Sequence, residues 1–190
     1  MAEVKIFNMG GFDNWAADSF IRYMLAVENS NQPYAIVNQT SGGGYVYALN
    51  KILDCMAASN KPVVCINSGI SASCAAVLFA ASDYRVMGES STLLIHEPSG
   101  GTYGKTTDME ADVNNIKDTR AWMFDLLDKK CKQPSGFFAK LSFDCNNSDI
   151  YLKAQDCLEH NIADDIGALN SVLRMSDKEI MDKCNKRFKK

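Results

Sequence analysis

Apolar and polar positions along the N-terminal part of the chain follow one pattern that repeats three times. Apolar runs at Val4–Met9, Tyr34–Asn38 and Pro62–Asn67 predict strands. Helical periodicity follows each of them, over about residues 14–28, 45–58 and 74–81. Nearly continuous apolar strands that alternate with helices are typical of a parallel sheet built from right-handed crossovers and covered by helices. The pattern therefore predicts an α/β fold.

The second half of the chain is less regular and contains one long polar helix. Short apolar runs at 84–87 and 92–95 predict two further strands. The helical stretch from Thr107 to about Lys132 has too few apolar positions to face a core, so we expect it to project from the body or to pack on another subunit. Shorter helices are expected from Phe137, over about 153–159 and from Asp177, and no linker or repeat divides the 190 residues, which favours a single domain over 1–190.

Composition narrows the class of protein. A net charge of −3 offers no basic surface for nucleic acid. The seven cysteines form no Cys-x-x-Cys pair, which predicts free thiols in a reducing compartment, and with two histidines no metal site and no cofactor is expected. The N-terminal residues lack the apolar core of a signal peptide, and no apolar run approaches the ~20 residues of a membrane span. We expect a soluble cytoplasmic protein.

Two of the expected strand ends carry unusual residues. Gly42–Gly44 follows the second strand, and Gly69–Ser73 follows the third. In parallel α/β sheets, ligands gather beyond the carboxyl ends of the strands. A serine before a helix lies beside unpaired N–H groups that stabilise negative charge, as a nucleophile requires, although a packing turn or an N-cap would use the same residues. The triple glycine lacks the Lys-Ser/Thr of a phosphate-binding loop.

A serine hydrolase also needs an imidazole base and a carboxylate. His96 follows an apolar strand, whereas His160 lies at the polar end of a helix, where the helix dipole explains it. The choice of serine stays open at this point. Gly69-Ile70-Ser71-Ala72-Ser73 half-matches the Gly-x-Ser-x-Gly turn, which would select Ser71, but its last position is not glycine.

Four segments read together resemble the Clp protease proteolytic subunit, a family of serine peptidases. The family's motifs Ser-Pro-Gly-Gly, Gly-x-Ala-Ala-Ser-Met-Gly-Ala, Ile-His-Gln-Pro-x-Gly-Gly and an Asp before an aromatic residue and a short helix are matched by Ser41–Gly44, Gly69–Ala76, Ile95–Gly101 and Asp149–Ala154. The resemblance covers roughly residues 4–170. It implies the fold shared by this family and the crotonases, with repeated β-α units and a protruding handle helix.

The resemblance also assigns roles to particular residues. It implies Ser73, rather than Ser71, as the nucleophile, His96 as the base and Asp149 as the carboxylate that orients it. If Asp149 proves dispensable, Asp144, Asp156 and Asp164 are the other carboxylates to consider. The backbone N–H groups of Gly44 and Cys74 would form the oxyanion hole. The substrate-binding residues that it implies are Gly43, Ser99, Gly100, Gly101 and Thr102, the last four in an extended segment that pairs with polypeptide as an added strand.

The resemblance implies assembly as well, with departures. The long helix matches the handle that joins two heptameric rings around an inner chamber. Because the first expected strand begins at Val4, the axial segment that the family uses is short, and docking of an unfolding ATPase is not favoured. The family's Arg-Asp pair for ring stacking is Ser148-Asp149, and its Pro is Gly42. These departures suggest a divergent member, for which a virus-encoded processing peptidase is one candidate.

The leading hypothesis is a serine endopeptidase in an oligomeric ring, acting on polypeptides through an acyl-enzyme. One alternative is a non-catalytic or regulatory ring subunit of the same fold. Another is a crotonase-type acyl-CoA enzyme, which uses paired backbone N–H donors on a thioester oxyanion and would not need His96.

Overall fold

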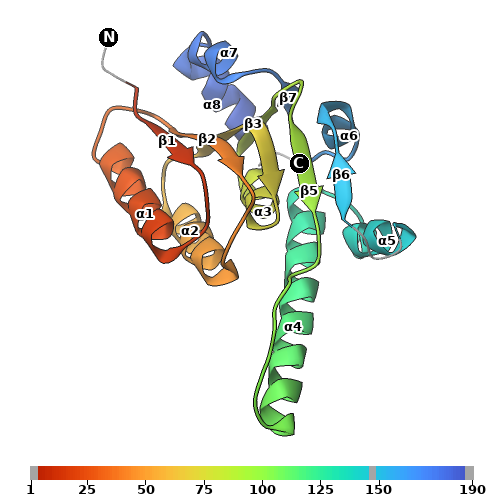
Figure 1. Ribbon diagram of the computed structural model, residues 1–190. Helices are drawn as coiled ribbons and strands as arrows, with labels where there is room; N and C mark the ends of the chain where they lie inside the picture. The colour runs from red at the N-terminus through yellow and green to blue at the C-terminus, as the bar shows by residue number, and fades with distance from the viewer. Residues whose placement is uncertain (1–3, 146–148, 187–190) are drawn as a thin grey trace.

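The computed structural model describes residues 4–145 and 149–186, which form a mixed α/β fold around one seven-stranded sheet (Figure 1). In chain order the elements are β1 (Ile6–Met9), α1 (Asn14–Glu28), β2 (Ala35–Ser41), α2 (Val46–Ala58), β3 (Val63–Ala72), α3 (Cys74–Ala81), β4 (Tyr84–Met87), β5 (Thr92–Ile95), α4 (Thr106–Lys130), α5 (Phe137–Asp144), β6 (Ile150–Leu152), α6 (Ala154–Glu159), β7 (Asp165–Ile166), α7 (Leu169–Leu173) and α8 (Asp177–Lys186). The predicted fold class is confirmed.

The sheet is organised around β3. The strand order β1-β2-β3-β4-β7 is parallel throughout, and β4 pairs with the first half of β3. The second half, Ile70–Ala72, pairs in parallel with β5, which in turn pairs antiparallel with β6. The prediction that the third strand ends near Asn67 is therefore wrong, because β5 provides a second ladder that extends the strand to Ala72.

Helices cover both faces of the parallel strands. Val37 and Cys65 pack with α1, α2 and α3 in the larger apolar core, whereas Ile36 and Ile66 face the other side and pack with residues of α7 and α8. Successive residues of a strand point to opposite faces, so a strand between two helical layers is apolar at every position. This double cover explains the continuous apolar runs of the sequence. Every residue of α3 is buried, which makes this helix a rigid support for whatever precedes it.

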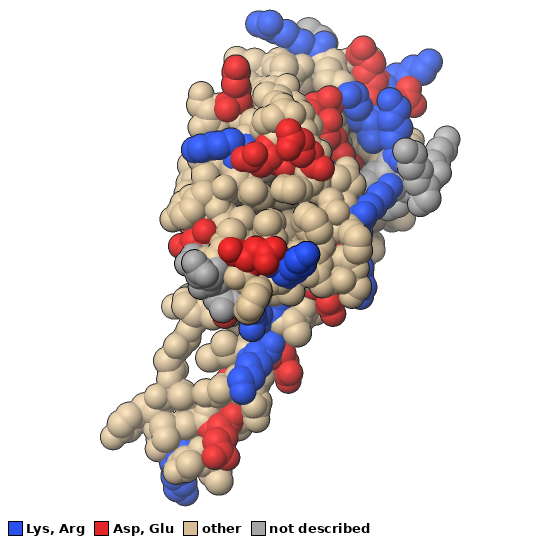
Figure 2. All heavy atoms as spheres, turned by 90° about the vertical axis from the view of Figure 1, so that its right-hand side faces the viewer, with Lys and Arg blue, Asp and Glu red and all other residues tan. Residues whose placement is uncertain are grey.

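The long helix α4 projects from the body, as its polar sequence predicts. Its buried residues, Met123, Phe124, Leu127 and Asp128, all lie in the last two turns. Figure 1 shows the N-terminal part of the helix extending away from the sheet, with the segment that follows β5 running alongside it. Figure 2 shows this part as a narrow arm, and acidic and basic side chains are mixed over the face in view.

A buried ion pair ties β4 to the turn before β7. The Arg85 side chain is 1% exposed, and its Nη2 and Nε donate to the two carboxylate oxygens of Asp164 at 2.7 and 2.9 Å. Its Nη1 donates to the carbonyl of Asn161 at 2.8 Å. A planar guanidinium that meets a carboxylate in this two-pronged way fixes both partners. Asp164 is thereby committed to a structural role.

Candidate active site

Ser73 occupies the sharp turn between the central strand and the buried helix. β3 ends at Ala72, α3 begins at Cys74, and Ser73 between them has φ 58° and ψ −124°. A positive φ is uncommon for a residue with a side chain and marks a turn that the surrounding structure enforces. Such a strand-to-helix turn holds a serine hydroxyl out at the end of the sheet. Ser73 is half-buried, so its side chain is accessible.

Ser71, the other serine of this stretch, has a different environment. It lies inside β3, paired with Ser41 on one side and Leu93 on the other, and it is 0% exposed. Its hydroxyl accepts a hydrogen bond of 2.6 Å from Nε2 of Gln39, which is also fully buried. Ser71 is therefore a core residue behind the turn, and the extension of β3 to Ala72 separates the two serines.

The glycines after β2 make the closest approach to this turn. Gly43 has φ 97°, and a Cβ there would lie 2.7 Å from Cβ of Ser73. Gly44 has φ 149°, and a Cβ there would lie 2.3 Å from the carbonyl oxygen of Phe12. Both positions require glycine, for the backbone conformation and for the space. Gly42 has neither restriction, since nothing lies within 4 Å of its added Cβ.

Two backbone N–H groups remain available beside Ser73. The N–H of Phe12 donates to the carbonyl of Gly43 at 3.1 Å, and because the peptide is planar and trans, the N–H of Gly44 points away from Phe12. Among the described residues, none accepts from this N–H. The N–H of Cys74 is the first of α3 and has no intrahelical acceptor. Paired donors of this kind can stabilise an oxyanion.

The Cys74 side chain links these two donors. Its thiol donates to the carbonyl of Gly44 at 3.2 Å. Burial raises the pKa of the Cys74 thiol, and a hydrogen bond that the thiol donates also favours its neutral form. The thiol is therefore neutral at physiological pH and brings no negative charge to the place where the two N–H groups would hold an anion.

The positions of His96 and Asp149 relative to each other follow from the pairing of β5 with β6. Ile95 pairs with Ile150 in the antiparallel ladder, so the next pair beyond the strand ends is His96 and Asp149. Directly opposite residues of antiparallel strands carry their side chains on the same face, with Cβ atoms about 5 Å apart. Ser73 lies on the opposite side of β5 from β6, where its N–H donates to the carbonyl of Leu94 at 2.9 Å. Three neighbouring strands thus bring these residues to one edge.

The strand register brings Ser73, His96 and Asp149 to the same end of the sheet, without a hydrogen bond between them in the part of the chain that the structure describes. Free enzymes often hold catalytic groups at longer distances that shorten in the complex with substrate. Of the alternatives to Asp149, Asp164 binds Arg85, and Asp156 accepts from the N–H of Lys153 at the start of α6. Asp144 is exposed at the end of α5.

The sequence as a whole matches a known family. The family model described as Clp protease matches residues 1–170 of this 190-residue chain. The chain belongs to the Clp protease family. This confirms the resemblance found in the sequence, and the parallel sheet flanked by helices agrees with it. Family membership supports a Clp-like peptidase, and it does not favour an acyl-CoA enzyme.

Side-chain interactions tie the extended segment of this Clp protease family member to α4. Glu97 forms a 2.8 Å ion pair with Arg120, and Thr102 donates to Asp112. A Cβ at Gly100 would lie 3.1 Å from Cδ1 of Ile116, so the backbone approaches α4 closely there. Within the described residues, the backbone N–H and C=O groups of residues 97–103 make no hydrogen bonds. They are therefore free to pair with an added strand.

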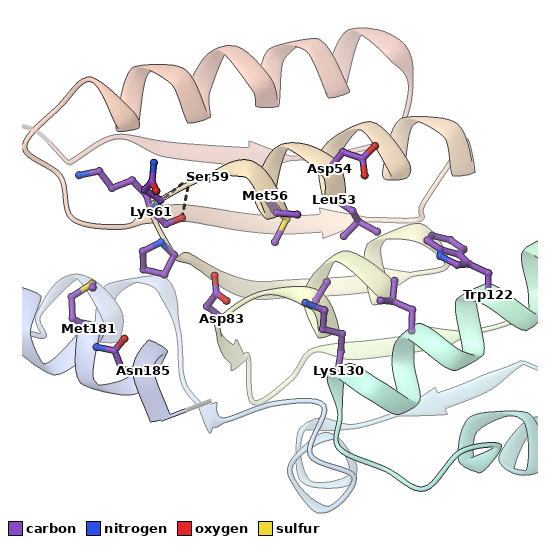
Figure 3. Close-up of a pocket in the computed structure, with 15 residues that line it drawn as sticks. Leu53, Asp54, Met56, Ser59, Lys61, Asp83, Trp122, Lys130, Met181 and Asn185 are labelled. Carbon is purple, nitrogen blue, oxygen red and sulfur yellow. Dashed lines mark hydrogen bonds between the residues drawn. The ribbon is translucent and has the colours of Figure 1, made fainter. Parts of the chain in front are cut away.

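Two cavities lie along the gap between α2 and α4. One, of about 620 Å³, includes none of the candidate site residues, and Figure 3 shows it with Met181 and Asn185 at one end and Trp122 at the other. The second cavity, of about 460 Å³, is called the α2–α4 pocket here. Its walls include Tyr45, Asn50, Pro98, Ser99, Asp118 and Trp122. Because Tyr45 follows Gly44, and Pro98 lies two residues after His96, the α2–α4 pocket opens beside the site.

Two further residues, Phe12 and Ser41, support the glycine loop of the candidate site. Phe12 binds the glycine loop on both sides, since its carbonyl also accepts from the N–H of Tyr45 at 2.7 Å. Ser41 is buried, and its hydroxyl accepts from the N–H of Gly43 at 3.1 Å. Ser41 belongs to the glycine motif quoted from the sequence, whereas no motif in the sequence marks Phe12.

Metal sites, cysteines and membrane-spanning helices are three further features to consider in the described residues. No group of three or more His, Cys, Asp or Glu in the described residues is arranged to hold a metal ion. All seven cysteines are free thiols. None of the helices in the described part of the chain has the length and hydrophobicity that crossing a bilayer requires.

Proposed function

We propose that this Clp protease family member is a serine endopeptidase that cleaves polypeptides inside an oligomeric chamber. Ser73 is the nucleophile, His96 the general base and Asp149 the carboxylate that orients it. The backbone N–H groups of Gly44 and Cys74 form the oxyanion hole. The observation that carries this proposal is the positive φ of Ser73, at a turn beside β5. His96 directly follows β5, and Asp149 directly precedes β6, the strand paired with β5.

The proposed reaction proceeds in two steps. His96 takes the proton of Ser73 Oγ as this oxygen attacks the scissile carbonyl, and the carbonyl oxygen becomes an oxyanion held by the two N–H groups. The intermediate collapses to an acyl-enzyme when His96 returns the proton to the leaving amine. Water then attacks the ester in the same way and releases the second product. Asp149 holds the imidazole in the required tautomer throughout.

Substrate binding is proposed to use the free backbone of the extended segment. Ser99, Gly100, Gly101 and Thr102 would pair with the polypeptide as an added strand, which reads main chain more than side chains. Gly43 would leave room for the substrate backbone at the turn. The projecting α4 would pack on another copy of the chain, which supports an oligomeric ring and does not by itself decide whether two rings stack.

The test is active-site labelling by a fluorophosphonate. Wild-type protein should be labelled, and Ser73→Ala should abolish labelling and lower peptidase activity by about 10⁴-fold or more, because members of a triad act as a unit. Ser71→Ala is the matched control, since it removes a hydroxyl two residues away that lies in the core. Labelling that survives Ser73→Ala and disappears with Ser71→Ala would reverse the assignment.

The same experiment separates the second candidate function. A wild-type protein that assembles into a ring but takes no label under any condition would be a non-catalytic ring subunit. Asp149→Asn tests the third member of the triad. If this variant keeps full activity, Asp144 becomes the carboxylate to examine, because Asp156 and Asp164 have structural partners.

A further inference from the structure

The α2–α4 pocket, which opens beside the candidate site, is lined by several aromatic side chains. Aromatic side chains stand around it, since Tyr45, Tyr47 and Trp122 are 72%, 73% and 37% exposed and all line it. Exposed aromatic rings gathered at one cavity provide flat surfaces for a long side chain of a ligand. The cavity volume of about 460 Å³ is ample for any single amino-acid side chain.

The charged and polar groups of the α2–α4 pocket favour a positively charged ligand over a negatively charged one. Asp118 of α4 lines it, and no ion pair to Asp118 occurs among the described residues. Asn50 of α2 lines it as well, and its Oδ1 is buried without a hydrogen-bond donor. No Lys or Arg is among the described residues that line the pocket. Arg120, two positions from Asp118 on the same helix, is paired with Glu97. The pocket therefore combines aromatic faces with acceptors and an uncompensated carboxylate.

The adjoining cavity does not share this character. The cavity of Figure 3 meets the α2–α4 pocket at Trp122, which lines both. Its lining includes Lys61 and Lys130 as well as Asp54, so charges of both signs face it. Of the two cavities, the α2–α4 pocket beside the candidate site is therefore the one whose lining favours a cation.

We propose that the α2–α4 pocket receives a lysine or arginine side chain of the substrate, next to the scissile bond. Aromatic faces attract such cations, and Asp118 supplies the opposite charge. This inference rests on the proposed peptidase function, because it assigns the substrate preference of the same site. Asp118 is then a specificity-determining residue, and it takes no part in the bond-breaking steps.

The experiment compares peptide substrates that differ at one position. Fluorogenic peptides with Lys, Arg, Leu, norleucine or Glu before the scissile bond are assayed with wild type and with Asp118→Asn. We expect wild type to prefer Lys and Arg, and Asp118→Asn to lower kcat/KM for these two by about tenfold while the values for Leu and norleucine change by less than about twofold. Asp118→Lys should reverse the charge preference toward Glu.

Asp125→Asn is the matched control, since Asp125 is an exposed carboxylate of the same helix that lines neither cavity. Its substrate preference should equal that of wild type. Cleavage that depends on Ser73 but favours Leu or norleucine over Lys would overturn the inference and leave the peptidase proposal standing. If no peptide is cleaved and no fluorophosphonate label is taken up, the proposed function itself fails.

Discussion

Gly44 connects the geometry of a single residue to the proposed chemistry. Its φ of 149° and the 2.3 Å approach of an added Cβ to the Phe12 carbonyl exclude any side chain without movement of the backbone. The same loop aims the N–H of Gly44 away from Phe12. Glycine is therefore required at position 44 for two reasons, the backbone conformation and the space beside Phe12.

Gly44→Ala should therefore remove an oxyanion donor. The methyl group has to displace the loop from Phe12, so kcat should fall by about 10²- to 10³-fold, as for the loss of one such donor elsewhere, with a smaller change in KM. Gly42→Ala is the control in the same loop, because its Cβ meets nothing within 4 Å, and its activity should stay close to wild type. Steady-state peptide hydrolysis measures both. Equal activity of the two variants would remove Gly44 from the oxyanion hole.

At the scale of the elements, the sequence predicts what depends on local pattern. The start of α1 is an example: the predicted helix over about residues 14–28 begins at Asn14, and Asp13 caps it by accepting from the N–H of Ala16 at 2.7 Å. β4 and β5 have the predicted bounds as well. Every residue of β4 is buried and its apolar side chains face both cores, whereas β5 buries alternate residues, Leu93 and Ile95, in the larger core. Both patterns give a strong strand signal.

Long-range pairing is what the sequence did not reveal. β6 has only three residues, Ile150–Leu152, and it is a strand because β5 lies beside it. The extension of β3 to Ala72 has the same cause. Both features matter at the candidate site, since one puts Asp149 opposite His96 and the other buries Ser71. A motif alone left the two serines undecided for this reason. Ser148, which stands where the family has the arginine of its Arg-Asp pair, lies outside the described residues.

The link between β4 and β7 gives a stability prediction. Asp164→Asn leaves the Arg85 guanidinium buried without its carboxylate, which should lower the free energy of unfolding by about 3 kcal/mol. Asp18→Asn breaks the Lys51–Asp18 pair, whose side chains are 43% and 52% exposed, and should change the free energy of unfolding far less than Asp164→Asn does. Urea unfolding measures both changes. Folded Asp164→Asn protein should still take the fluorophosphonate label, whereas loss of the label without loss of stability would make Asp164 a catalytic candidate again.

At the scale of the whole molecule, the projecting part of α4 is the feature that a single copy does not explain. The segment that follows β5 runs alongside it, and this part of α4 carries Met109 and Val113 four residues apart on one face, with Val113 41% exposed. Residues at this spacing lie side by side along a helix and form an apolar strip. An exposed strip on a thin arm favours contact with another copy of the chain.

Val113→Asp should weaken that contact by placing a charge in the strip. If arms of two rings or two subunits meet there, wild type should have the mass of a multimer, and Val113→Asp should yield a particle of smaller mass with unchanged helix content. Ala111→Asp introduces the same charge about 200° around the helix from Val113, outside the strip, and should assemble as wild type does. Native mass spectrometry and sedimentation measure the particles directly, and circular dichroism measures the helix content. A monomeric wild-type protein, or equal masses for the two variants, would show that the arm has another purpose. If the mass does fall, peptidase activity of the smaller particle then tells whether Ser73, His96 and Asp149 connect within one chain or only in the assembly.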